Sequence, residues 1–186
     1  MIEAESFQIR EAGKGAVISD CGLYRYALWR VWNLTLPLIL FIMLNPSKAD
    51  AFIDDPTIRR CIGFAVSLKA GGFLVGNLFA FRATRVRDMK RASMPVGADN
   101  DRWLSQLSTL AQIKIAAWGV HGNFMGRDRE VCALIPQMSC LGTTKDGRPR
   151  HPLFLRRTCK PSEFELPALM SEVTRWPERE ATHWMN

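Results

Sequence analysis

Four apolar segments dominate the sequence, and each is followed by a short group of small polar residues. The segments span residues 38–44, 73–75, 113–118 and 138–141. Stretches with helical spacing lie between them, and strands that alternate with helices are typical of a mostly parallel sheet. The seven consecutive apolar residues of 38–44 are typical of a strand that is covered on both faces. We therefore expect these four segments to form neighbouring parallel strands.

Further elements are expected on either side of this sheet. Residues 15–20 and 22–33 flank Asp20-Cys21-Gly22 and predict an N-terminal hairpin. In the second of these strands Tyr24, Tyr26 and Leu28 alternate with Arg25, Ala27 and Trp29, as in a strand with one buried face. A helix is expected to begin at Pro56, with Asp55 as its N-cap, and to stop near Gly71. Other helices are expected from Val96 or Asn100 to Ala111, over 127–134 and over 163–173.

The length and composition predict a single α/β domain over residues 1–186, with a tail from 161 to 186. The chain has five cysteines without metal-ligand spacing, which indicates free thiols in a reducing cytoplasm and no metal. No signal peptide is visible, and the longest apolar stretch is too short to span a bilayer. We expect a cytoplasmic monomer that has no membrane association and needs no cofactor.

The distribution of charge favours nucleic acid as the partner. The net charge is +7, and basic residues gather in Arg59-Arg60, in 82–91 and in 145–157, each beside a predicted strand end. The sequence has no Walker A loop, GxGxxG, GxSxG or HExxH motif. Triphosphate hydrolysis, NAD chemistry and serine hydrolysis therefore lose support, and DNA or a nucleotide becomes the expected ligand.

Polar side chains at the strand ends are the candidates for chemistry, because ligands of open parallel sheets bind beyond the carboxyl ends of the strands. Asn45, in Asn45-Pro46-Ser47, offers an amide that can hold a water against an electrophilic carbon, or can simply close an Asx-type turn. Asp50, Asp54 and Asp55 follow. Asp55 fits a helix cap, and Asp50 or Asp54 can serve as a general base or hold a cation.

Three later segments add further candidates. Asn77 can read the edge of a base or satisfy neighbouring backbone, and Phe79 can stack on a base or pack in the core. His121 lies in a glycine-rich segment before a predicted helix, where backbone N–H groups can bind phosphate. His151 can donate a hydrogen bond to an oxyanion, or it can be an incidental residue of a solvated basic loop.

Longer motifs carry a resemblance to known proteins. Residues 41–50 (FIMLNPSKAD) and 54–61 (DDPTIRRC) resemble an uncharacterised domain family found in bacteria and phages. The resemblance covers about residues 22–157 and implies no established activity. Later segments that match the same family are GNLFAFRAT (76–84), Asn100-Asp101, Ala117-Trp118-Gly119 and the segment from Thr144 to Leu153.

The chain is also distantly similar to the uracil-DNA glycosylase superfamily, especially its mismatch-specific branch. In that superfamily an Asn-Pro motif positions the attacking water and a late His-Pro motif stabilises the departing base. Asn45, Asn77 and His151 occur here in the corresponding order. The resemblance implies a three-layer α/β/α sandwich with a central, mostly parallel, four-stranded sheet. Ser47 replaces the usual Gly, and Leu153 follows His151-Pro152 where the family has Ser.

The leading hypothesis is therefore hydrolysis of the N-glycosidic bond of a modified or mismatched base in DNA or a nucleotide, in DNA repair or modification. Asn45, His151 and Asp50 are the expected catalytic residues, and Asn77 and Phe79 contact the base. Leu153 or Phe154 is the expected wedge that fills the gap left by a flipped base. Lys48 can instead act as a nucleophile that permits strand cleavage. Expected phosphate contacts are Ser47, Lys48, Arg82, Arg148, Arg150 and Arg156.

Two alternatives remain open. One is a module that binds nucleic acid or a modified base without chemistry. The other is a phage-type enzyme of base modification or nucleotide salvage.

Overall fold

The computed structural model describes residues 7–167, which form an α/β fold around one mixed sheet of seven strands. The strands lie in the order β1-β2-β4-β3-β5-β6-β7. Their bounds are β1 Gly13–Ile18, β2 Arg25–Val31, β3 Leu38–Met43, β4 Gly72–Asn77, β5 Ile113–Ala116, β6 Ser139–Cys140 and β7 Ser162–Glu163. The helices are α1 Pro56–Ser67, α2 Val86–Arg91, α3 Asn100–Leu110 and α4 Arg127–Leu134, with short 3-10 turns η1 Phe124–Gly126 and η2 Pro152–Phe154.

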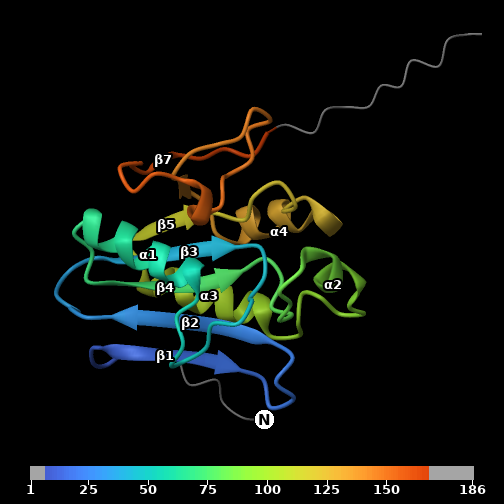
Figure 1. Cartoon of the computed structure of the whole chain (residues 1–186), viewed down its shortest axis with the longest axis horizontal. Coiled ribbons are helices and arrows are strands. Elements are labelled where there is room, and N and C mark those ends of the chain that lie inside the picture. Colours follow the sequence, from blue (N-terminus) through green and yellow to red (C-terminus); the bar gives the residue numbers. More distant parts are fainter. Residues whose placement is uncertain (1–6, 168–186) are drawn as a thin grey trace, which may run out of the picture.

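The four central strands β4, β3, β5 and β6 are parallel neighbours, which confirms the prediction made from the four apolar segments. Figure 1 shows β3, β4 and β5 pointing in the same direction, with β2 reversed beside them. The predicted N-terminal hairpin is confirmed as the antiparallel pair β1 and β2. The prediction of a four-stranded sheet gave too few strands, because this hairpin and β7 extend the same sheet at its two edges.

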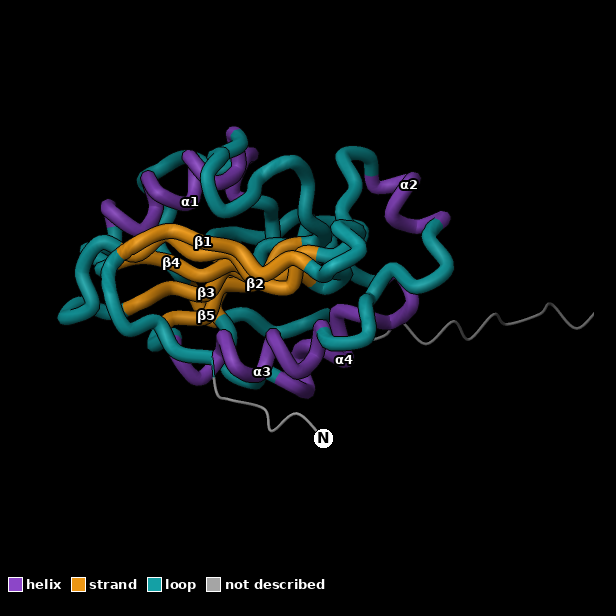
Figure 2. The backbone as a smooth tube through the Cα atoms, turned by 90° about the horizontal axis from the view of Figure 1, so that it is seen from below, coloured by secondary structure: helices purple, strands orange, loops and turns teal. Residues whose placement is uncertain are grey.

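Helices cover both faces of the sheet, as Figure 2 shows, with α1 on one side and α3 and α4 on the other. The alternation along β3 explains this arrangement, since a strand presents successive residues to opposite faces. Ile39 and Phe41 pack in the cluster that contains the buried face of α1. Leu40 and Ile42 pack in the cluster that contains Leu104 of α3. Each such fully buried side chain contributes roughly 1.5–3 kcal/mol.

Local interactions fix the two elements that approach the carboxyl ends of the strands. Asp55 caps α1 by accepting from the backbone N–H of Ile58 (2.9 Å), with Pro56 in the first helical position. Arg60 of α1 donates to the carbonyl oxygens of Pro152 (3.4 Å) and Leu155. Helix α1 thereby holds η2, and with it His151, over the end of the sheet.

The structure differs from the prediction in two smaller elements. Helix α2 lies where an Arg-rich loop was expected. Glu163 belongs to strand β7 and not to a helix over 163–173, and residues 168–173 lie outside the described part of the chain.

Candidate functional site

A cavity of about 600 Å³ opens at the carboxyl ends of β3 and β5. Its walls come from the loops after these strands, the start of α1 and the η2 segment, so residues far apart in the sequence share it. Those that bear on chemistry are Arg25, Asn45, Ser47, Lys48, Asp55, Trp118, His121 and His151, with Leu153 and Phe154 at the exposed rim.

The side-chain amide of Asn45 is fixed in one orientation. Its Nδ2 donates to the carbonyl oxygens of Ala83 (2.7 Å) and Pro46 (3.0 Å). Because both donated hydrogens belong to this nitrogen, the hydrogen bonds determine which end of the amide is oxygen. Among the described residues nothing donates to Asn45 Oδ1, so this oxygen is the acceptor that Asn45 offers to a ligand.

His151 is arranged as a neutral donor. Its Nδ1 accepts from the backbone N–H of Leu153 (3.3 Å), which requires Nδ1 to carry no proton. Burial lowers the pKa of His151, and the charge of Asp55 opposes that shift only in part. The neutral imidazole therefore carries its hydrogen on Nε2, as a donor toward a ligand.

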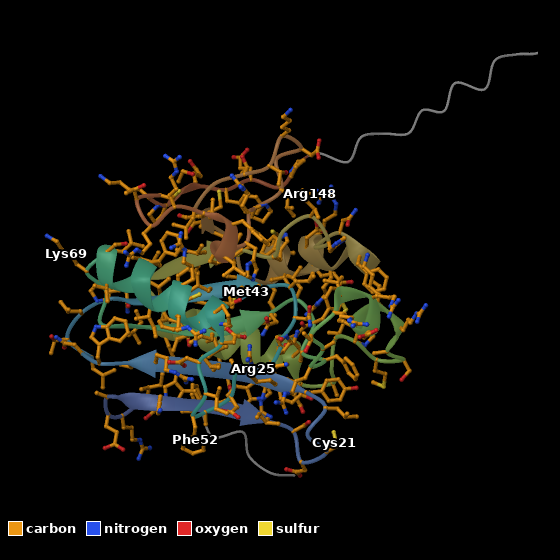
Figure 3. The ribbon with its side chains drawn as sticks, in the orientation of Figure 1. Cys21, Arg25, Met43, Phe52, Lys69 and Arg148 are labelled. Atoms are coloured by element: carbon orange, nitrogen blue, oxygen red, sulfur yellow. The ribbon has the colours of Figure 1, made fainter. Side chains whose placement is uncertain are left out.

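Two charged residues of the cavity were not assigned to a site from the sequence. Arg25 is 3% exposed, although its strand was expected to have a solvent face. Strand β2 is buried on both faces, since all of its residues except the half-buried Trp29 are buried. Asp55 was expected only to cap α1, and its carboxyl group both caps the helix and lines the cavity. Figure 3 labels Arg25, at the start of β2.

The structure does not bring Asn77, Phe79 or Asp50 to this cavity. Asn77 is still paired in the sheet, opposite Met43, and its buried amide has no hydrogen-bond partner among the described residues. Phe79 is fully buried and packs against Phe124 with ring centroids 5.6 Å apart. The carboxylate of Asp50 accepts from the backbone N–H groups of Phe52 and Ile53 (2.8 Å each), which lowers its pKa.

The basic residues divide into two groups. Lys48 and Arg82 line a second hollow of about 380 Å³, which has Ser47, Lys48, Ala83 and Thr84 in common with the main cavity. Arg148 is paired with Asp128 at 2.6 Å. Arg150 donates to the carbonyl oxygen of Phe154 (3.2 Å), and Arg156 is exposed. Only the first group therefore lines the cavity or the adjoining hollow.

Within residues 7–167 no cluster of His, Cys, Asp and Glu side chains is arranged to hold a metal ion. All five cysteines, which lie in this range, are free. No helix in the described part of the chain has the length and apolar character needed to cross a membrane.

Comparison with known proteins assigns the chain to a family. Residues 25–153, more than half of the chain, match the family described as "Protein of unknown function (DUF1643)", and the chain belongs to it. This agrees with the expected membership of an uncharacterised family. Neither the curated proteins nor the solved structures contain a match to the chain.

Proposed function

We propose that this member of the DUF1643 family hydrolyses the N-glycosidic bond of a modified or mismatched base in DNA or a nucleotide. One observation carries the proposal. A carbonyl acceptor fixed on Asn45 and a neutral imidazole donor on His151 line the same cavity. Its volume of about 600 Å³ falls within the usual range for small-ligand sites.

These two groups suit the two ends of the reaction. Water held by Asn45 Oδ1 attacks the anomeric carbon, the bond from that carbon to the base nitrogen breaks, and its electron pair leaves with the base. The His151 Nε2–H donates to the base oxygen on which negative charge develops. Asp55 takes the role first assigned to Asp50, because Asp55 lines the cavity and its charge can stabilise the electron-poor sugar and accept the proton of the water.

The surroundings of the cavity supply the remaining contacts of the proposal. The hollow beside Lys48 and Arg82 is suited to a flanking phosphate, with Ser47 on the wall between the two spaces. Leu153 and Phe154, which are 43% and 70% exposed at the rim, are candidates for a wedge that replaces a flipped base. Helices on both faces of the sheet are compatible with the three-layer sandwich of the uracil-DNA glycosylase superfamily. We place the protein in the cytoplasm as a monomer.

Release of free base tests the proposal directly. Single-stranded and mismatched oligonucleotides that carry a panel of modified bases are incubated with the protein, and free base is measured by chromatography. We expect Asn45→Ala and His151→Ala to lower kcat by about 10²–10⁴-fold, which is the usual loss of a catalytic donor or base. Asn123→Ala is the matched control, since Asn123 is exposed and outside the cavity.

A pair of substitutions separates the two nitrogens of His151. The amide of Gln lies near the position of Nε2 and retains a donor, whereas the amide of Asn lies near Nδ1 and retains only the contact with Leu153. We expect His151→Gln to retain more activity than His151→Asn. No release from any substrate, or release unchanged by both the Asn45 and His151 variants, contradicts glycosylase activity. Salt-dependent binding without release indicates the binding module, and equal competition by free nucleotides indicates nucleotide salvage or modification.

A further inference from the structure

The buried guanidinium of Arg25 has fewer partners than its five N–H donors require. Nη1 donates to the carbonyl oxygen of Ala49 (2.8 Å), and Nε is buried without any acceptor in the described part of the chain. No carboxylate of residues 7–167 lies within ion-pair distance of Arg25. A buried charge that lacks acceptors is costly unless something else supplies them.

Arg30, on the same strand, is a buried arginine whose side-chain hydrogen-bond donors have acceptors within the protein. It is 6% exposed, and its three side-chain nitrogens donate to Asp54 Oδ1, to the carbonyl oxygen of Trp29 and to that of Asp50, each at 2.8 Å. It also forms an ion pair with Asp54 at 2.6 Å. Arg25 is equally buried on β2 but lines the cavity and lacks such a set of acceptors.

The charges around Arg25 do not neutralise it. Asp55 and Asp50 act on it from beyond ion-pair distance, and Arg30 and Arg82 add positive charge of the same kind. One oxygen of Asp55 is occupied by the α1 cap, and Asp50 accepts from two backbone N–H groups. Lys48 adds a further cation to the cavity wall. The charge of Arg25 therefore has no paired carboxylate among the described residues.

We infer that Arg25 binds a negatively charged group of the ligand inside the cavity, and that this charge is carried by the ring placed near His151. The inference takes from the proposed function that the ring is a nucleic-acid base. It concerns the binding of that base and does not require the base to be released. Arg25 and His151 line the main cavity and not the neighbouring hollow. Arg82 lines that hollow, which suits a phosphate, and Lys48 lines both spaces. The preferred base therefore carries an acidic substituent.

Equilibrium binding of three small probes tests this inference with the full-length protein. Orotate carries a carboxylate on a pyrimidine ring, uracil is its neutral counterpart, and inorganic phosphate is an anion without a ring. We expect calorimetry to show that orotate binds at least tenfold more tightly than uracil and more tightly than phosphate. Arg25→Met is expected to remove the preference for orotate, and Arg30→Met, where it folds, to retain it.

The outcomes distinguish this inference from the proposed reaction. Orotate binding that depends on Arg25 supports the inference even when no oligonucleotide releases a base. If phosphate binds more tightly than orotate and Arg25→Met removes phosphate binding, Arg25 still forms an anion site. That result overturns the assignment of the negative charge to the ring. Equal binding of orotate and uracil by the wild type overturns the inference, as does orotate binding that Arg25→Met leaves unchanged. Arg25→Lys serves where the Met variant does not fold, and we expect it to retain only part of the preference.

Discussion

The imidazole of His151 links the cavity to the pH dependence of stability. Burial lowers its pKa in the folded protein, while in the unfolded chain the group regains its ordinary pKa near 6.5. As the pH falls through that value, the unfolded chain binds more protons than the folded protein does. The free energy of unfolding therefore decreases toward acidic pH.

His151→Asn removes this titration and retains an acceptor for the N–H of Leu153. We expect the wild type to lose more stability than His151→Asn between pH 8 and 5, because only the wild type has the buried imidazole. Urea unfolding at intervals across this range measures the difference. Parallel stability curves for the two proteins would show that folding does not change the pKa of His151.

Individual residues differed in how far the sequence could place them. Asn45 was a candidate because it directly follows an apolar strand, and His151 because it lies in a His-Pro motif beside several arginines. Arg25 was missed because it occupies an alternating position, which indicates solvent as readily as a cavity. Asn77 was expected at the rim, but the ladder between β3 and β4 continues through Met43 and Asn77 and keeps the Asn77 amide buried.

The start of α1 combines two roles of Asp55 that substitution can separate. Asn accepts the N–H of Ile58 about as well as Asp does, whereas Ala removes the cap at a cost of about 0.5–2 kcal/mol. We expect Asp55→Asn to retain nearly the wild-type free energy of unfolding and Asp55→Ala to lose it by that amount. Both variants should lose base release, because both lack the carboxylate. If Asp55→Asn is folded and fully active, the role of Asp55 is restricted to capping α1.

Long elements were predictable and short ones were not. The apolar run of β3 and the capped α1 carry strong local signals, since each has enough residues to display its period and its boundary. Strand β7 has two residues and depends on pairing with β6, more than twenty residues away in the sequence. Helix α2 has six residues and buries Met89 alone, too little for a helical period to be visible.

The close packing of α3 against the sheet depends on Gly76 in β4. A Cβ at this position would lie 2.5 Å from Leu104 Cδ2, which is too close for the two atoms to coexist without movement. We expect Gly76→Ala to destabilise the protein by about 1–3 kcal/mol, as overpacking of a core commonly does. Gly13→Ala is the control, since a Cβ added to Gly13 on the edge strand β1 would meet nothing within 4 Å. Thermal unfolding of the two variants measures the difference, and equal melting temperatures would contradict close packing at Gly76.

The whole molecule carries a net charge of +7, but only part of that charge faces the cavity. Arg127 and Arg148 are paired with acidic side chains, and Arg60 binds backbone carbonyl groups. Such residues count among the 25 lysines and arginines without being available to a phosphate. Composition alone therefore favoured an anionic partner but could not say which cations would meet it.

Lys48 and Arg82, which line the hollow beside the cavity, are the cations whose removal should change salt dependence. Each phosphate contact to a single strand contributes about 0.7 to the slope of log K against log salt, because binding releases counterions. We expect the double variant Lys48→Ala, Arg82→Ala to bind a single-stranded oligonucleotide more weakly and to lower that slope by about 1.4. Lys69→Ala is the control, since Lys69 follows α1 at the end opposite Asp55 and projects from the molecule in Figure 3. Fluorescence anisotropy from 50 to 200 mM salt, a range over which about six contacts to a single strand change affinity by about 300-fold, measures the slope. If the double variant and Lys69→Ala show the same slope, the nucleic-acid contacts lie on another face of the protein. The phosphate subsite would then be removed from the proposal.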